Sequence, residues 1–176
     1  MDILWIIVLA LVGAVAAVLV AASTRPDDFR TARTLKISAP PERIFPLIND
    51  LRQMNTWNPF ALRDTGVTAT YGGGPNGPGQ FHTFAGSKSG SGSIEIIEAM
   101  PASKVVMRLK MTKPLKCDNR VEFTLEPTVG ATNVTWAMSG QQPLLAKAMS
   151  LFIDCDKMVG KEFEAGLALL KTKVEA

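Results

Sequence analysis

His82 is the only histidine in the 176-residue chain, and it is the side chain best suited to acid–base chemistry. An imidazole with a near-neutral pKa can donate or accept a proton as a general acid or base. His82 lies in a strand-like segment, Gln80–Ala85, where it shares one face with Phe84. Asp64 and Glu95 are potential partners only if the fold brings them close. We therefore assign no catalytic residue and keep His82 as a weak candidate, against the alternative of an ordinary strand histidine.

Other kinds of site have little support in the sequence. A zinc site needs three or four convergent His, Cys, Asp or Glu side chains, and one histidine with the separated Cys117 and Cys155 does not supply them. The segment Gly86-Ser-Lys-Ser89 lacks the glycine spacing of a phosphate-binding loop and is typical of a flexible hairpin turn. We expect two free thiols, no metal and no cofactor.

The charge of the chain also limits its partners. The formal net charge is +3, far below the basic footprint that is usual for nucleic-acid-binding proteins. We therefore expect no nucleic-acid partner. No feature of the sequence identifies a protein partner.

Residues 3–22 form an uninterrupted apolar run. As a helix, a run of this length spans about 30 Å, the thickness of a bilayer core. The alternative is a cleaved signal peptide, but that class has a basic segment before a shorter apolar run, and only Met1 and Asp2 come first here. We predict an uncleaved single-pass anchor within residues 1–24.

The flanking charges predict the orientation of this anchor. No Lys or Arg precedes the apolar run, whereas Arg25 and Arg30 are the first of several basic residues that follow it. Basic flanks tend to stay in the cytoplasm. We therefore predict a cytoplasmic domain at residues 33–176, joined to the anchor by a tether at residues 25–32.

The remaining chain has the pattern of an α+β domain. A strand is predicted to begin at Arg33, and Ser38-Ala-Pro-Pro-Glu42 is typical of a helix start. Short helices then lead to Trp57-Asn-Pro59. After a glycine-rich loop that begins at Tyr71, apolar and polar residues alternate in successive segments as far as Met138. Short turns between such segments predict an antiparallel meander with one buried face.

A long amphipathic helix is expected at the C-terminus, from Leu144 to Val174. Apolar residues recur at helical spacing, and we expect Phe152, Met158 and Phe163 to face inward. Such a helix needs a broad apolar surface to cover, and a curved antiparallel sheet provides one.

This order of elements, with its local motifs, resembles the START-like superfamily, also called SRPBCC or helix-grip. More narrowly, it is similar to the polyketide cyclase/dehydrase and lipid-transport group. The motifs that carry the resemblance are Ile37-Ser-Ala-Pro-Pro-Glu-Arg-Ile-Phe45, Asp50 with Trp57-Asn-Pro59, Gly92-Ser-Ile-Glu-Ile-Ile97 with Pro101, Lys113-Pro114, Thr132-Asn-Val-Thr-Trp136, Asp156-Lys-Met-Val-Gly160 and Phe163-Glu-Ala-Gly-Leu167. The resemblance implies a curved antiparallel sheet wrapped around a long C-terminal helix. The functions of this family range from binding hydrophobic ligands to aromatase/cyclase chemistry, and the fold alone does not determine which function a member has.

A ligand-binding interior would be mostly apolar with a few polar groups. Side chains predicted to point between sheet and helix supply both kinds. The apolar candidates are Trp57, Phe84, Met107, Phe123, Trp136, Met138 and Phe163, and the polar candidates are Asn58, Tyr71 and His82. The alternative for each is ordinary core packing.

Three functions follow from these observations. The first is a membrane-anchored module that binds a small hydrophobic molecule or lipid between the sheet and the C-terminal helix. The second is a cyclase- or dehydratase-like enzyme that acts on an apolar or polyketide-like substrate through His82 together with a carboxylate or tyrosine of the cavity. The third is a scaffold or protein-interaction domain with a closed core.

Overall fold

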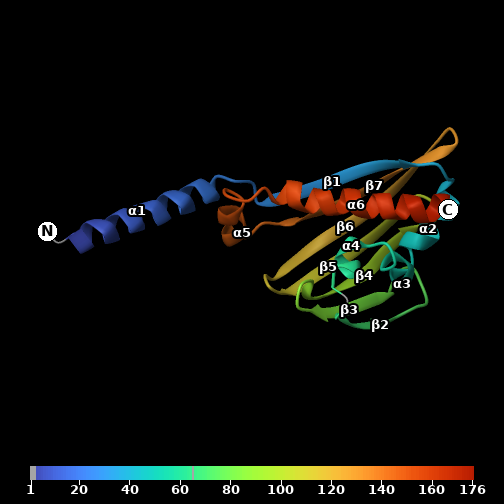
Figure 1. Ribbon diagram of the computed structural model, residues 1–176, viewed down its shortest axis with the longest axis horizontal. Coiled ribbons are helices and arrows are strands. Elements are labelled where there is room, and N and C mark those ends of the chain that lie inside the picture. Colours follow the sequence, from blue (N-terminus) through green and yellow to red (C-terminus); the bar gives the residue numbers. More distant parts are fainter. Residues whose placement is uncertain (1–2, 65) are drawn as a thin grey trace.

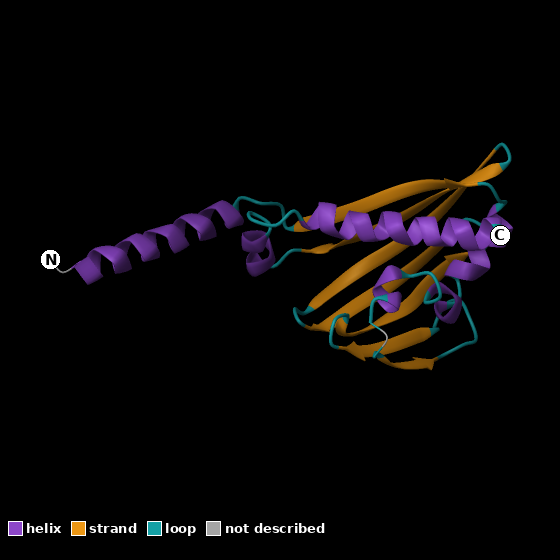
Figure 2. Cartoon of the chain, viewed as in Figure 1, coloured by secondary structure: helices purple, strands orange, loops and turns teal. Residues whose placement is uncertain are grey.

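The computed structural model describes residues 3–64 and 66–176, which form a projecting N-terminal helix and an α+β domain (Figure 1). The domain is a seven-stranded antiparallel sheet with a long C-terminal helix lying along one face. Figure 2 shows the sheet curving beneath this helix, with shorter helices at the far end. The predicted helix-grip fold is confirmed.

The N-terminal helix α1 (Ile3–Ser23) is apolar on all sides and lies outside the domain core. Its mean hydropathy is 3.1, and its length and composition are those of a helix able to cross a membrane, which a signal sequence shares. At its end, the hydroxyls of Ser23 and Thr24 donate to backbone carbonyls one turn earlier, at 2.7 and 2.8 Å. These bonds occupy carbonyls that the helix terminus would otherwise leave open.

The sheet has the strand order β1-β7-β6-β5-β4-β3-β2. Its strands are β1 (Asp28–Ile37), β2 (Thr68–Gly72), β3 (Phe81–Gly86), β4 (Gly90–Met100), β5 (Lys104–Lys113), β6 (Cys117–Thr128) and β7 (Ala131–Gln141). Neighbours in the sequence pair from β2 to β7, through short turns except for the glycine-rich loop between β2 and β3. β1 joins the meander by pairing with β7. The predicted meander is therefore correct.

One face of the sheet, which we call the inner face, packs against the C-terminal helix. Register places Arg33, Trp136 and Phe123 side by side on it, because Trp136 pairs with both of the others. Farther along, Met107 pairs with Val121 of β6 and with Ile96 of β4. Alternation along each strand then gives a mostly apolar layer.

Three short helices cover one end of the sheet: α2 (Pro41–Ile48), α3 (Leu51–Met54) and α4 (Pro59–Leu62). Prolines begin α2 and α4, where the missing N–H costs nothing. The Asp50 side chain caps α3 by accepting from the Arg52 backbone N–H at 2.9 Å. Trp57 lies in the turn between α3 and α4 and is buried in the core.

The predicted single C-terminal helix is wrong, because it is two helices, α5 (Leu144–Met149) and α6 (Cys155–Glu175). Asp154 begins α6 by accepting from the Lys157 backbone N–H at 2.9 Å. The inward position expected for Phe152 is also wrong, since this side chain lies in the break and is 77% exposed. Met158 likewise points outward from α6.

α5 packs against α1 rather than against the sheet. Lys147 of α5 is buried and forms an ion pair with Asp27, just before β1. The break therefore divides the C-terminal segment into a part attached to the projecting helix and a part attached to the sheet.

Two strand boundaries also differ from the prediction. β1 begins at Asp28 rather than Arg33, since Asp28 already pairs with Gln141 of β7. The first five residues of β1 lack a clear apolar alternation, so only the partner strand reveals them. β2 was not predicted; Tyr71, expected to begin a loop, lies in this strand opposite His82.

Candidate functional site

Four of the predicted site residues form an aromatic cluster with Phe60: Trp57, Phe123, Trp136 and Phe163. The Trp136 and Phe163 rings stack with centroids 4.3 Å apart, and Phe123 lies 4.9 Å from Trp136. Trp57 meets Trp136 edge-on at 5.8 Å. Apart from Phe60, which is partly exposed, these rings are buried. The cluster fixes α4 and α6 against β6 and β7.

Two indole groups in this cluster differ in hydrogen bonding. Trp57 Nε1 donates to the Leu47 carbonyl at 2.9 Å. Trp136 Nε1 is buried and has no partner among the described residues. Leaving a buried N–H unpaired costs about 1–3 kcal/mol of stability. An acceptor atom that reached Trp136 Nε1 would therefore be bound favourably.

A second aromatic group, the His82 stack, comprises Tyr71, His82 and Phe84 at the other side of the inner face. The His82 ring lies 4.6 Å from that of Tyr71 and 5.6 Å from that of Phe84. Burial lowers the pKa of the imidazole, which therefore favours the neutral form. The Tyr71 hydroxyl accepts from Asn55 Nδ2 at 2.7 Å. The inward position predicted for His82 and Phe84 agrees with the register of the strands.

Neither of the two carboxylates considered as partners of His82 is placed to act with it. Asp64 accepts the backbone N–H groups of Lys88 and Ser89 at 2.9 and 3.1 Å, and these bonds lower its pKa. It therefore holds the turn between β3 and β4. Glu95 is exposed and pairs in register with the exposed Phe81, on the face opposite His82.

Other predicted residues lie in the core, at half-buried positions of the inner face and at a helix cap. Met107 is buried in the core, whereas Met138 and Phe84 are only half-buried on the inner face. Asn58 caps α4 by accepting from the Phe60 backbone N–H at 3.1 Å. The structure thus gathers the predicted aromatic side chains and His82 into two separate groups, while Met107, Met138 and Asn58 lie outside both.

Asn119 is a polar group of the inner face that sequence reasoning missed. It is buried in β6, and its Oδ1 has no hydrogen-bond partner among the described residues. Its Nδ2 faces the sulfur atoms of Cys117 and Met138, at 3.4 and 3.7 Å. The available signal was one asparagine at an inward position of a strand whose other inward residues are apolar.

Gly140 makes room for this asparagine. A Cβ at position 140 would lie 2.2 Å from Asn119 Oδ1 and 3.2 Å from the Phe29 ring. Asn119 and Phe29 therefore meet over Gly140 at the end of the sheet nearest α1. A bound hydroxyl could satisfy Oδ1 at this position.

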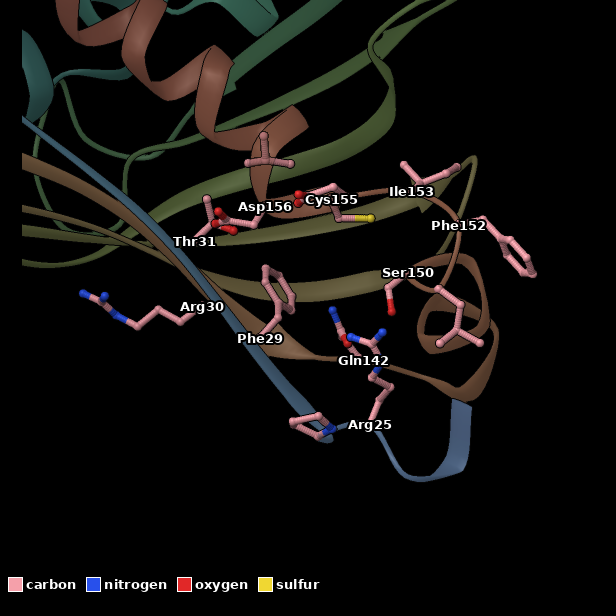
Figure 3. Close-up of a pocket in the computed structure, with 14 residues that line it drawn as sticks. Arg25, Phe29, Arg30, Thr31, Gln142, Ser150, Phe152, Ile153, Cys155 and Asp156 are labelled. Atoms are coloured by element: carbon pink, nitrogen blue, oxygen red, sulfur yellow. The ribbon is translucent and has the colours of Figure 1, made fainter. Parts of the chain in front are cut away.

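A hollow of about 550 Å³, the anchor-side hollow, opens at the same end (Figure 3). The start of β1, the end of β7 and the α5–α6 connection line it. In Figure 3, the Arg25 guanidinium lies beside Gln142 and Ser150, and the Phe29 ring points into the same space. Arg30 also lines the hollow, with its side chain directed away from Gln142. These segments are far apart in the sequence, which explains why no motif predicted the hollow.

Within residues 3–64 and 66–176, no three His, Cys, Asp or Glu side chains lie close enough together to hold a metal ion. Cys117 and Cys155 are free thiols, as expected. Burial raises the pKa of the Cys117 thiol, so it remains protonated and weakly nucleophilic.

Comparison with known proteins agrees with this architecture. The model of the family described as polyketide cyclase / dehydrase and lipid transport matches residues 28–175. Among curated proteins, none matches the sequence.

Several solved structures are similar in fold at low sequence identity. Protein CV1439 from Chromobacterium violaceum is 18% identical, with a TM-score of 0.59 over 86% of this chain and 99% of its own. Protein MLL2253 from Mesorhizobium loti is 15% identical, with a TM-score of 0.62 over 84% and 97%. DynU16, from the dynemicin biosynthetic locus, is 14% identical, with a TM-score of 0.59 over 86% of this chain and 48% of its own.

Proposed function

Because the chain belongs to the polyketide cyclase/dehydrase and lipid transport family, we propose that it binds a small hydrophobic molecule or lipid on the inner face of its sheet. In this proposal α1 is a retained membrane anchor and the domain is cytoplasmic. The ligand lies between the sheet and α6, where the half-buried Met138 and Phe84 leave apolar surface only partly covered.

The observation that carries the proposal is Asn119. Its Oδ1 is a buried acceptor without a partner, set among apolar side chains of the inner face. Ligand pockets combine such an apolar lining with a few polar groups that orient the ligand. A ligand hydroxyl that donates to Oδ1 would remove the cost of leaving it unpaired. We therefore expect an apolar ligand that carries a hydrogen-bond donor.

Native mass spectrometry of the full-length protein released from nanodiscs tests this proposal, because it weighs any small molecule that remains bound. The discs contain equal amounts of a long-chain alcohol and its methyl ether, which lacks the hydrogen-bond donor. We expect the alcohol to be retained about fivefold over the ether, since one neutral hydrogen bond contributes about 1 kcal/mol.

A matched pair of variants distinguishes binding at Asn119 from nonspecific binding of apolar molecules. Asn119→Ala removes the acceptor on the inner face and should abolish the preference for the alcohol. Asn133→Ala makes the same change on the opposite face of the neighbouring strand β7, where Asn133 pairs with Lys36 and Glu126, and should preserve it. A preference that survives Asn119→Ala contradicts the proposal. Retention of neither molecule is the result expected of a scaffold with a closed core.

A cyclase- or dehydratase-like activity is the second candidate, favoured by His82. This imidazole is buried on the inner face and its pKa is lowered, so it is a neutral base at physiological pH. Incubation with a model poly-β-ketone thioester would give dehydrated or cyclised products that mass spectrometry detects. Products from the wild type and none from His82→Phe would favour this activity, and no reaction with either would exclude it for that substrate class.

A further inference from the structure

We infer that the anchor-side hollow binds the phosphate of a phospholipid from the bilayer that holds α1. This inference rests on the proposed anchoring by α1. The site adjoins the inner-face position proposed for the apolar ligand and shares Phe29 with it, but its polar groups are Arg25 and Gln142 rather than Asn119.

Arg25 supplies the charge for this site. It follows the end of α1 by two residues, which places it at headgroup depth when α1 spans the bilayer. Arg25 forms no salt bridge among the described residues. Its guanidinium lies beside the Gln142 amide (Figure 3), so both groups can donate to one phosphate.

The carboxylates around the hollow already have partners. Asp156 is bound by Arg33 Nη2 at 3.0 Å, and this contact lowers its pKa. Asp154 accepts from the Lys157 backbone N–H, and Asp27 pairs with Lys147. Asp154 keeps its charge, because a backbone N–H does not neutralise it, whereas Arg25 and Arg30 both line the hollow and form no salt bridge among the described residues. The lining therefore has a net positive charge, which favours an anionic group.

The apolar residues of the rim place this end of the domain against lipid. Leu145 of α5 is 60% exposed and Phe152 in the following connection is 77% exposed. Leu144, Met149 and Ile153 are exposed around them. Figure 3 shows Phe152 pointing out of the hollow, as expected for a side chain that meets the membrane interface. Phe29 and Leu151 line the hollow and can contact the glycerol and the first methylenes of the lipid.

Photo-crosslinking of the full-length protein in nanodiscs tests the inference. The discs contain phosphatidylcholine and a small fraction of a phospholipid with a diazirine on its headgroup. We expect crosslinks in residues 25–31 and 142–156. Arg25→Gln should reduce them about tenfold, because a hydrogen bond to a charged group is worth about 1.5 kcal/mol or more. Arg52→Gln removes the same charge from α3, outside the lining of the hollow, and should leave labelling unchanged.

Equal labelling of the wild type and Arg25→Gln, or an equal loss in both variants, would overturn the inference. If excess inorganic phosphate abolishes the labelling, the ligand is free phosphate rather than a lipid. That result would also overturn the inference. Failure of the protein to stay with the discs would refute the anchor and with it this site. Loss of headgroup labelling in a protein that stays with the discs and still prefers the alcohol refutes this site alone.

Discussion

Gly166 of α6 lies directly against the indole of Trp136 on β7. A Cβ at position 166 would fall 2.6 Å from Trp136 Cζ3 and 2.9 Å from Pro59 Cδ. Both neighbours belong to rigid rings, and Trp136 is held by the rest of the aromatic cluster. The absence of a side chain at position 166 therefore sets how closely α6 approaches the sheet.

We predict that Gly166→Ala destabilises the protein, although alanine is the better helix former by about 1 kcal/mol. Overpacking of a rigid core typically costs about 1–3 kcal/mol, so the free energy of unfolding should fall despite the gain in propensity. Urea denaturation followed by tryptophan fluorescence measures this change. The exposed Ala165 is the control, because Ala165→Gly alters propensity alone; a Gly166→Ala protein as stable as the wild type would refute the prediction.

The pH dependence of stability should reveal His82. Burial lowers its pKa below the ordinary value of 6.5, so the unfolded chain binds more protons than the folded chain as the pH falls below that value. The free energy of unfolding therefore decreases with falling pH, and this loss levels off below the lowered pKa. Carboxylates with lowered pKa, such as Asp64 and Asp118, contribute only at more acid pH.

We predict that His82→Phe removes this part of the acid sensitivity while keeping an aromatic ring between Tyr71 and Phe84. Urea midpoints measured between about pH 8 and pH 5 cover the window in which a histidine titrates. The wild type should lose stability across it and the variant should stay nearly constant. Parallel curves for the two proteins would show that His82 is not buried as a neutral base.

The ion pair between Asp27 and Lys147 should attach α5 to the start of β1. Its hydrogen bond to the Lys147 ammonium lowers the pKa of Asp27, and Lys147 is 6% exposed. Asp27→Asn leaves the buried ammonium of Lys147 without its partner. We therefore expect amide hydrogen exchange to become faster in α5 than in the wild type, and to change less in α6. Asp28→Asn, at the neighbouring exposed position, should leave the exchange of α5 unchanged. Equal protection of α5 in both variants would contradict the role of the pair.

Membrane insertion of α1 predicts the behaviour of the full-length protein in cells. With a C-terminal tag, it should sediment with membranes and resist alkaline extraction. The tag should be digested only when the cytoplasmic side is opened to protease, since the basic residues follow the helix. A mature chain that begins at Ser23, or digestion from outside, would show a cleaved signal sequence or the opposite orientation.

The sequence predicts the inner face well where strands have one buried side. Val121, Phe123 and Leu125 alternate with polar residues, and the structure buries all three. The same period placed His82 beside Phe84. These predictions succeed because a half-buried antiparallel strand repeats every two residues.

The break between α5 and α6 could not be predicted from that kind of pattern. Apolar spacing continues through Leu151 and Phe152 as if one helix ran on. What interrupts it is the packing of α5 on α1 and the cap at Asp154. The missing hydrogen-bond partner of Asn119 and the anchor-side hollow also required the structure, since the neighbouring residues come from separate segments of the chain.

The short connection between α1 and β1 limits where the domain can work. Only residues 24–27 separate the two elements, and four extended residues reach about 14 Å at most. With α1 in a bilayer, this reach holds the start of β1 within about 14 Å of the end of α1, so the sheet begins beside the surface of its own membrane. If the domain binds an apolar ligand as proposed, that ligand enters and leaves beside the leaflet that holds α1, so the anchor restricts exchange to this membrane and the adjoining solution.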